Sequence, residues 1–410
     1  MPVTDLTAQL EQSDWWWRDD LSYLDNQLHF AGYSVQKLAY QFGTPSFIYS
    51  SARVKANLQR VRDALDAAGL AGRSSIYYAM KANRFAPLLR SIKQTGQCGI
   101  DACSPNEVKH ALSCGFMPSD ISFTATSLSK KDFDELARYD GLFMDCDSLH
   151  TIRCWGELKP GSEIGIRINP ALGIGRACNE KLHYSGCVTT KFGIYWEQFE
   201  QALELADEYD LVVRKIHFHT GCGYLTPELE QLDHVISECM KFVDAAPDAT
   251  RVNIGGGLGL PHLPGEQVLD LAQWSDVLKK HFGQRNIHVE VEPGDYVCKD
   301  AGLLLLGKTY VEKKLDTVFA GVDAGFNIAP EPAYYGLPFQ PVPLFLDDSP
   351  LAPVHVVGNI NEALDVWYEN AMLPNLEQHD YLALINAGAY SSSMASNHCM
   401  RGEFNEFLLD

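Results

Sequence analysis

The segment Ile76-Tyr77-Tyr78-Ala79-Met80-Lys81 is a short run of apolar and aromatic residues that ends at a lysine. Such runs are typical of buried strands. Similar runs follow, separated by stretches with helical spacing such as Ser104 to Leu112 and Glu197 to Tyr209. They cover residues 99–102, 121–124, 142–145, 164–168, 215–219, 252–254 and 288–291. Eight strands that alternate with helices predict an α/β fold, a closed (β/α)8 barrel of the TIM type, and not an open doubly wound sheet.

The pattern changes after Glu292, where strand-like segments follow one another without long helices between them. Val354 to Val357 and Tyr381 to Ile385 are two of these segments. Together with a strand-like segment at Gln27 to Phe30, they predict a second, mostly β domain. We therefore expect a barrel domain at residues 45–300 and a β domain formed by residues 1–44 plus 301–410.

The composition limits the classes of partner. The formal net charge of −20 argues against a nucleic-acid or anionic-membrane surface, because phosphate groups bind to clustered lysine and arginine. No run approaches the ~20 apolar residues of a membrane span, and the N-terminus lacks a secretory pattern, so we expect a cytoplasmic protein with no membrane partner. The eleven cysteines never form a CxxC pair, so neither a disulfide framework nor a metal site is predicted.

Polar residues or glycines follow nearly every predicted barrel strand, and barrel enzymes keep their catalytic groups at these strand ends. They are Lys81, Asp101, Arg167, His219, Gly255, Gly256, Gly257 and Glu292. Lys81 ends an apolar strand, where a desolvated amine has a lowered pKa and readily forms a Schiff base with an aldehyde. A surface lysine just past a strand is the ordinary alternative.

The triple glycine at 255–257 also follows a strand, and glycines there let backbone N–H groups close around a phosphate. A common glycine turn is the alternative. The chain contains neither GxGxxG with a downstream acid nor GxxxxGK[ST], which disfavours dinucleotide and nucleoside triphosphate binding.

Two histidines and a glutamate complete the candidate site. His217 and His219 face the same side of one predicted strand, where a flat imidazole can stack on an aromatic ring. A metal site would need more ligands, and a packed core histidine is the other reading of His217. Glu292 precedes a Pro-Gly turn, where a carboxylate either keeps a pyridine nitrogen protonated or caps the turn.

Taken together, these motifs resemble the fold-type III, alanine-racemase-like enzymes that use pyridoxal 5′-phosphate (PLP), and within them the diaminopimelate and ornithine decarboxylase family. The resemblance extends over nearly the whole chain. Its landmarks are Tyr78 to Asn83, Asp101 to Ser104 with Glu107, Arg167 to Pro170, Lys191 to Gly193, His217 to Gly221, the triple glycine, Glu292 to Gly294, and Gly388 to Tyr390.

The resemblance implies a role for each site residue. Lys81 would bind PLP covalently, His219 would stack on its ring, and Glu292 would contact the pyridine nitrogen. The phosphate would be held by Gly255, Gly256, Gly257 and Tyr390, and Asp101 and Arg167 would line the same pocket. Racemases of this fold place an arginine opposite the pyridine nitrogen, so Glu292 favours decarboxylation. The family is homodimeric, and Gly358 to Asp365 resembles the segment that completes the partner's pocket.

Three positions depart from the family pattern. Asn361 stands where the family usually carries a cysteine that returns a proton to the α-carbon, and an amide is no general acid. We therefore assign that proton to Lys81, His219 or a water molecule. Asp295 and Glu331 stand where diaminopimelate decarboxylases usually carry carboxylate-binding arginines.

The two reversed charges, with Glu362 as a third acid, predict a substrate whose far end is cationic, such as lysine, ornithine, arginine or a modified diamino acid. Solvated loop acids are the alternative reading of Asp295 and Glu331. The sequence thus predicts a PLP-dependent amino-acid decarboxylase. Diaminopimelate decarboxylation, an amino-acid racemase or epimerase, and a cofactor carrier without activity stay open.

Overall fold

The computed structural model describes residues 14–176, 189–219 and 221–410. Two compact units are present. The barrel unit comprises the described parts of Asn57–Gly259 and Val268–Tyr296, and the sheet unit those of Met1–Ala56 together with Leu260–Gln267 and Val297–Asp410.

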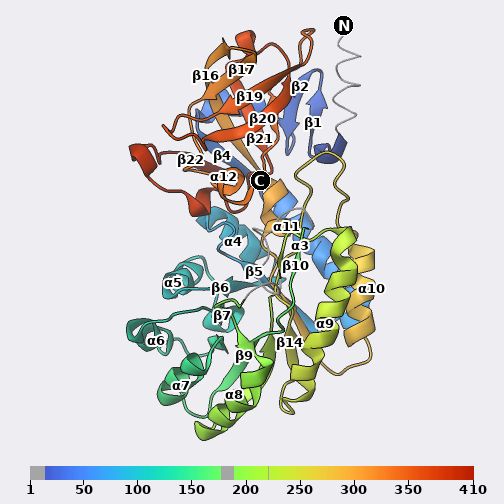
Figure 1. Cartoon of the computed structure of the whole chain (residues 1–410), viewed down its shortest axis with the longest axis vertical. Helices are drawn as coiled ribbons and strands as arrows, with labels where there is room; N and C mark the ends of the chain where they lie inside the picture. Colours follow the sequence, from blue (N-terminus) through green and yellow to red (C-terminus); the bar gives the residue numbers. More distant parts are fainter. Residues whose placement is uncertain (1–13, 177–188, 220) are drawn as a thin grey trace. The chain divides into compact units, whose positions relative to one another are not determined.

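The barrel unit contains a closed ring of eight parallel strands (Figure 1). In chain order they are β5 (Ser74–Ala79), β6 (Cys98–Ala102), β7 (Ile121–Thr124), β8 (Phe143–Cys146), β9 (Glu163–Asn169), β12 (Val212–His217), β14 (Arg251–Asn253) and β15 (His288–Val291). Each pairs with the next, β8 pairs with β9, and β15 pairs with β5 to close the ring. The predicted barrel is therefore confirmed, with a strand at every predicted run.

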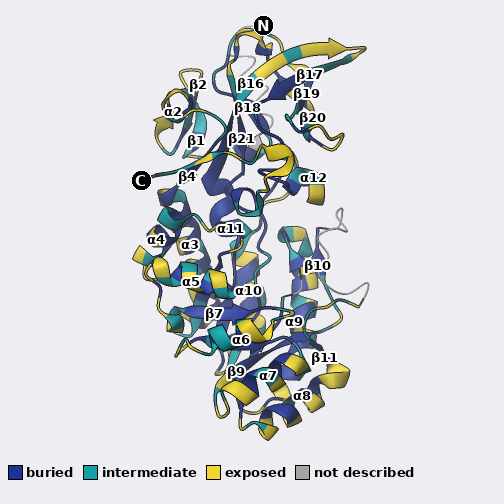
Figure 2. Cartoon of the chain, turned by 90° about the vertical axis from the view of Figure 1, so that its left-hand side faces the viewer, coloured by how far each residue is buried: buried dark blue, intermediate teal, exposed yellow. Residues whose placement is uncertain are grey.

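Helices alternate with these strands and turn an apolar stripe toward them. They are α4 (Ala86–Gln94), α5 (Pro105–Ser113), α6 (Lys130–Leu136), α7 (Leu149–Leu158), α8 (Trp196–Glu208), α9 (Leu229–Asp244) and α10 (Leu271–Phe282), while α3 (Ser51–Leu65) precedes β5. In the barrel unit, Figure 2 shows mainly dark blue strands and helices that carry both dark blue and yellow residues. The predicted helix start at Ser104 is an N-cap, because its hydroxyl accepts a hydrogen bond from Glu107 N.

One strand differs from its predicted extent. The run at 215–219 predicts a strand through His219, but β12 ends at His217. Phe218 N still donates to the carbonyl oxygen of Asn253 at 2.9 Å, after which the chain leaves the barrel wall. His219 therefore lies on the loop that follows β12. Short strands β10 (Ile174–Gly175), β11 (Ile194–Tyr195) and β13 (Gly221–Cys222) lie outside the ring.

The sheet unit is mostly β, as predicted. Its main sheet has the order β18-β21-β16-β17-β19-β20, and β4 pairs with β16 and β22. These strands are β4 (Ser46–Ser50), β16 (Gly302–Lys314), β17 (Thr317–Val322), β18 (Pro341–Pro343), β19 (Ala352–Val357), β20 (Val366–Leu373), β21 (Tyr381–Ile385) and β22 (Asn405–Leu409). A smaller sheet contains β1 (Leu21–Leu24), β2 (Gln27–Phe30) and β3 (Tyr33–Ser34). The short helices are α2 (Val35–Phe42), α11 (Asp295–Cys298) and α12 (Glu331–Tyr335).

One core joins the N-terminal strands to the main sheet of this unit. Trp16, Leu28, Phe30, Leu305 and Ile385 belong to the same buried cluster. The predicted association of the N-terminal strands with the β domain is explained by this shared apolar surface.

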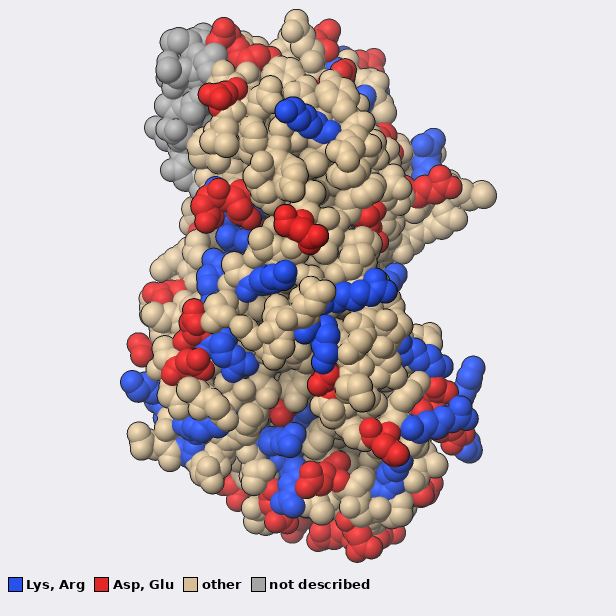
Figure 3. All heavy atoms as spheres, turned by 180° about the vertical axis from the view of Figure 1, so that it is seen from behind, with Lys and Arg blue, Asp and Glu red and all other residues tan. Residues whose placement is uncertain are grey.

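The surface carries mixed charges. On the face shown in Figure 3, lysine and arginine side chains are interspersed with aspartate and glutamate. Among the helices that the structure describes, none has both the length and the apolar content that a bilayer crossing requires.

Leu305→Ala tests the core of the sheet unit. Leu305 is fully buried in β16, so we expect the substitution to lower the free energy of unfolding by about 2–5 kcal/mol. Leu24 in β1 is 56% exposed, and Leu24→Ala should change the free energy of unfolding by less than about 0.5 kcal/mol. Urea denaturation of both variants measures the difference, and equal losses would contradict this core assignment.

Candidate active site

Lys81 lies just past β5, and Asp101 lies near the end of the neighbouring strand β6. The chain turns after β5, where Ala82 N donates to the carbonyl oxygen of Ala79 at 3.0 Å. Lys81 Nζ lies 3.7 Å from Asp101 Oδ2, and the lysine side chain is 46% exposed while Asp101 is buried. Burial and the nearby charge of Glu292 raise the pKa of Asp101 to about 7. The amine of Lys81 is thus within reach of solvent on one side and of a carboxyl group on the other.

Glu292 is held at the end of β15 by the backbone and by two side chains. Its N–H donates to the carbonyl oxygen of Gly255 at 2.8 Å. Oε1 accepts a hydrogen bond from Asn253 Nδ2 at 2.6 Å, and Oε2 lies 3.3 Å from His217 Nε2. Burial alone would raise the pKa of Glu292, but His217, Lys215 and Lys81 outweigh burial and lower it. The carboxylate is therefore ionised and fixed in orientation.

The triple glycine packs so closely that side chains would not fit. A Cβ on Gly256 would lie 2.2 Å from the carbonyl oxygen of Glu292, and one on Gly257 would lie 2.4 Å from that of Gly221. Gly255 and Gly257 have φ values of +70° and +101°, in the region that favours glycine. Asn253 Oδ1 accepts from Gly255 N at 2.8 Å, so one amide side chain links this loop to Glu292.

His219 is a half-buried and neutral histidine. Its Nδ1 accepts a hydrogen bond from Gly256 N at 3.3 Å, and Nε2 lies 3.6 Å from Cys222 Sγ. Burial, followed by the charges of Lys81 and Arg167, lowers the pKa of His219 to about 3. At neutral pH the side chain is therefore an uncharged flat ring.

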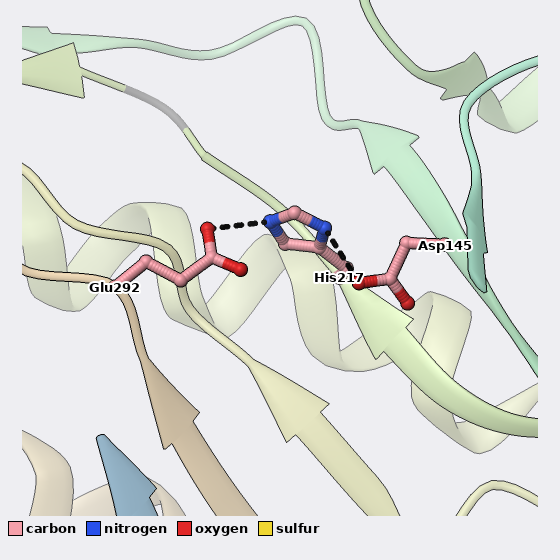
Figure 4. Close-up of side chains that lie close together, drawn as sticks. All are labelled: Asp145, His217 and Glu292. Carbon is pink, nitrogen blue, oxygen red and sulfur yellow. Dashed lines mark ion pairs between the residues drawn. The ribbon is translucent and has the colours of Figure 1, made fainter. Parts of the chain in front are cut away.

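Asp145, His217 and Glu292 form a buried row across the inside of the barrel (Figure 4). His217 Nδ1 lies 3.4 Å from Asp145 Oδ2, and Nε2 lies 3.3 Å from Glu292 Oε2. Burial opposes protonation of His217, but Glu292 and Asp145 outweigh it and raise the pKa to about 9. His217 therefore lies between two carboxylates, which an ordinary packed core histidine does not.

Lys215 lies two residues before His217 on β12 and faces the same side of the strand. Its Nζ lies 2.8 Å from Asp145 Oδ2 and 3.2 Å from Glu290 Oε2, and all three side chains are at most 1% exposed. Lys215 Nζ also donates to Ser122 Oγ at 3.0 Å. Burial would lower the pKa of Lys215, but Asp145 and Glu290 raise it instead. The ammonium group thus balances two buried carboxylates.

The other predicted barrel residues are Arg167 and Asp295. Arg167 is buried on β9, is paired in register with His217, and its guanidinium lies 4.8 Å from the centre of the Phe192 ring. Asp295 begins α11 and is half-buried.

Glu331, Asn361, Glu362 and Tyr390 belong to the sheet unit. Glu331 is buried at the start of α12, and Lys299 Nζ donates to both of its carboxylate oxygens at 2.6 and 2.7 Å. Asn361 and Glu362 are exposed, and Glu362 Oε1 lies 3.3 Å from His398 Nε2. Tyr390 has a φ of +52°.

Sequence reasoning missed Asn253, Asp145, Lys215, Glu290 and Lys299. The sequence did contain a signal for Asp145, Lys215 and Glu290, because a charged residue inside an otherwise apolar strand needs a buried partner. Lys215 and His217 alternate on one face of β12, as do Glu290 and Glu292 around the end of β15. The pairing of Lys299 with Glu331 joins residues 32 positions apart and leaves no local pattern.

Lys215→Met tests the buried charge balance. Removing the ammonium leaves Asp145 and Glu290 without their main cation, so we expect a loss of about 3–5 kcal/mol in the free energy of unfolding at pH 7. Burial opposes ionisation of Asp145, but Lys215 and His217 lower its pKa in the folded chain. The stability gained from this pairing is present above the pKa of an unfolded aspartate, about 3.9, and lost as the pH falls through the lowered value.

The difference between wild type and Lys215→Met should consequently shrink in acid, because protonated carboxyl groups no longer need the ammonium. Lys280→Met is the matched control, since Lys280 pairs with Asp233 at 2.7 Å but is 63% exposed, and its loss should cost about 0–1 kcal/mol. Denaturant titrations at pH 7 and at a pH well below about 3.9 measure both variants. Equal losses for the two lysines would refute the assigned role of Lys215.

The barrel residues fit the cofactor that the sequence implies. PLP takes an amine for its aldehyde, a cradle of donors for its phosphate and either an acid or an arginine beside its ring nitrogen. Lys81 supplies an accessible amine, the triple glycine has no room for side chains, and Glu292 is an ionised carboxylate.

Comparison with known proteins agrees with this chemistry. Residues 51–299 match the family model "Pyridoxal-dependent decarboxylase, pyridoxal binding domain", and residues 295–388 match "Pyridoxal-dependent decarboxylase, C-terminal sheet domain". The chain is similar to the diaminopimelate decarboxylase of Methanothermobacter thermautotrophicus, with 31% identity over 93% of this chain and 90% of that one. It is also similar to the diaminopimelate decarboxylase of Escherichia coli K12, with 27% identity over 92% of this chain and 91% of that one.

A solved structure shares both the fold and the extent of the chain. The diaminopimelate decarboxylase of Helicobacter pylori complexed with L-lysine is 26% identical, with a TM-score of 0.81 over 92% of this chain and 94% of that one. Family models thus cover both structural units, and relatives cover nearly the full length. The chain therefore belongs to the pyridoxal-dependent decarboxylases, which are PLP-dependent carboxy-lyases.

Proposed function

We propose that this protein removes the α-carboxylate of a diamino acid with PLP bound at Lys81. The observation that carries this proposal is the ionised carboxylate of Glu292, which Asn253 and His217 hold at the end of β15. Bound PLP supplies an electron sink for the electron pair that remains when carbon dioxide leaves. A carboxylate beside the ring nitrogen strengthens that sink, which favours decarboxylation over the racemase alternative.

Each residue of the barrel has a defined task in this proposal. Lys81 bonds to the aldehyde carbon, and the backbone of Gly255, Gly256 and Gly257 binds the phosphate. His219 presents a neutral ring, which suits stacking because an uncharged imidazole adds no repulsion beside a protonated pyridine. Asp101 and Arg167 line the pocket, and Tyr390 of the sheet unit contributes to phosphate binding.

The relatives suggest diaminopimelate as the first substrate to test. All three relatives named above are diaminopimelate decarboxylases by name, and the H. pylori enzyme was crystallised with L-lysine. Diaminopimelate that loses one α-carboxylate is lysine, so this chemistry yields the molecule found in that crystal.

A diamino acid without a second carboxylate is the other candidate, favoured by Asp295 and Glu331. The family resemblance places arginine at both positions, and acids there cannot bind a distal carboxylate. Lys299 already neutralises Glu331, so Asp295 is the stronger of the two arguments. Glu362 is a third acid, on an exposed loop.

We also propose that the enzyme is a homodimer that completes each pocket with the loop around Asn361. Asp365 shapes this loop, because its carboxylate accepts from Phe326 N at 2.7 Å and from Ile360 N at 2.6 Å. Asn361, Glu362 and Leu364 are exposed beyond it. The amide of Asn361 cannot donate a catalytic proton, and His219, with its pKa lowered to about 3, is neutral, so of the groups expected from the sequence Lys81 or water returns the proton to the α-carbon.

Lys81→Ala tests the attachment of the cofactor. Wild type supplied with PLP should turn yellow and should retain the cofactor covalently after borohydride reduction, whereas Lys81→Ala should lose both properties. Lys109→Ala is the control, because Lys109 is a half-exposed lysine of the same unit that pairs with Glu135. Peptide mass spectrometry locates the modified lysine, and a label on any other residue would overturn the assignment.

A substrate screen separates the two candidates. We expect carbon dioxide release from L-lysine, L-ornithine or L-arginine to exceed release from meso-diaminopimelate by about tenfold or more, since losing one charge-assisted contact costs about 1.5–3 kcal/mol. Asp295→Arg should shift the ratio toward diaminopimelate. Faster turnover of diaminopimelate by wild type would discard the charge argument and leave decarboxylation itself intact.

A further inference from the structure

We propose that His217 is a positioning residue that remains an imidazolium inside the barrel and holds the carboxylate of Glu292 ionised and oriented. The inference rests on the proposed function only in that Glu292 meets the cofactor ring. The arrangement itself involves residues of one unit and is visible without any ligand (Figure 4).

The first argument is the number of protons that His217 needs. A neutral imidazole has one N–H donor and one lone pair, so it can donate to only one neighbour. Here both ring nitrogens face carboxylate oxygens, at 3.4 Å from Asp145 and 3.3 Å from Glu292. With a single proton, one lone pair would face a buried negative charge. Among the residues that the structure describes, Nε2 makes no hydrogen bond of standard geometry, so the contact with Glu292 is ionic, and only the imidazolium places a positive charge against both carboxylates.

The second argument is that the nearby hydroxyl of Thr124 gives its proton to Asp145 and not to Nδ1 of His217. Thr124 Oγ1 lies 3.3 Å from His217 Nδ1, and a hydroxyl could in principle donate to a lone pair there. The hydroxyl instead donates to Asp145 Oδ2 at 3.1 Å, and Ser122 Oγ donates to the same oxygen at 3.3 Å. Nδ1 must therefore carry a proton and donate to Thr124 Oγ1, with Asp145 Oδ2 3.4 Å away as an ionic neighbour.

The third argument is the balance of charge. Three carboxylates are buried here, those of Asp145, Glu290 and Glu292. Lys215 lies between Asp145 and Glu290, and Arg251 lies 3.7 Å from Glu290. Glu292 has no such partner among these two cations, and its nearest charged neighbour is His217. A buried carboxylate without a cation is strongly disfavoured, so the imidazolium supplies the missing charge.

Other charged groups surround the cluster and enter the same balance. They are Lys81 after β5, Asp101 on β6, Arg167 on β9, and Lys215 and His219 from β12. Near pH 7 His219 is neutral, because burial lowers its pKa to about 3, whereas Asp101 is about half ionised, because burial and Glu292 raise its pKa to about 7. Two nearby carboxylates, in contrast, raise the pKa of His217 to about 9 against the effect of burial.

Nitrogen-15 NMR of the full chain with labelled histidine tests the proposal, with and without added PLP. We expect both ring nitrogens of His217 to be protonated at pH 7.5 and to lose a proton only near pH 9, about two units above an ordinary histidine. His217→Gln identifies the signals by their loss. Glu292→Gln keeps the histidine and should lower its titration midpoint by at least one unit, which covers the case in which His217→Gln does not fold.

His281→Gln is the matched control, because His281 Nε2 lies 2.7 Å from Asp233 Oδ1 on the outer helices of the same unit. It should leave the His217 titration unchanged. A second readout is stability, since a raised pKa gives stability that is complete below about pH 6.5 and lost as the pH rises through about 9. The gap between wild type and His217→Gln should narrow across that window, whereas the gap for His281→Gln should not.

A His217 that is neutral at pH 7.5, or a midpoint unmoved by Glu292→Gln, overturns the inference. This failure is distinguishable from failure of the proposed function. An enzyme that decarboxylates a diamino acid with a neutral His217 keeps the function and loses the inference. A chain that never binds PLP at Lys81 but shows the raised titration midpoint of His217 supports the inference and refutes the proposed function.

Discussion

The burial of carboxylates inside the barrel requires buried cations, and this requirement organises the site. Transferring an unpaired carboxylate out of water costs far more than one hydrogen bond returns. Asp145 and Glu290 are compensated by Lys215, and Glu292 by His217. The neighbouring strand leaves room for Asp145, because a Cβ at Gly165 would lie 1.8 Å from Asp145 Oδ1. Glycine at this position of β9 makes room for the acid that Lys215 and His217 share.

The register of the barrel strands places the charged residues next to the other residues of the candidate site. In the register of β12 with its two neighbours, His217 lies beside Arg167 on β9 and Asn253 on β14. Asn253 then uses both ends of its amide, one for Glu292 and one for Gly255 N. The glycine loop and the acid are therefore fixed by the same side chain. A shift of one residue in β14 would turn Asn253 away and release both groups.

The fold was largely predictable from the sequence, because apolar runs and helical spacing report burial directly. Every predicted barrel run contains a strand, and the segments at Val354 and Tyr381 belong to the predicted β domain. The end of β12 was not predictable, because Phe218 continues the apolar pattern and keeps one backbone hydrogen bond while the strand has already ended. The glycines, Lys81 and Glu292 could be selected as strand-end groups. Asp145 and Lys215 stood out as charged residues in apolar strands, but their pairing was hidden, because it joins residues of different strands that are far apart in the sequence.

The pairing of Lys299 with Glu331 changes what the reversed charges mean for substrate choice. Taken from the sequence, Asp295 and Glu331 are equivalent acids at two positions where arginine is usual. In the folded chain Glu331 has both oxygens bound by a fully buried ammonium, so that pair presents little net charge to a ligand. Asp295 lies in the other unit and is half-buried. Under the proposed function, Glu331 would differ from an arginine mainly by no longer attracting an anion, and attraction of a cationic substrate would fall to Asp295. The proposal thus treats the loss of carboxylate binding and the gain of amine binding as separate properties of different residues.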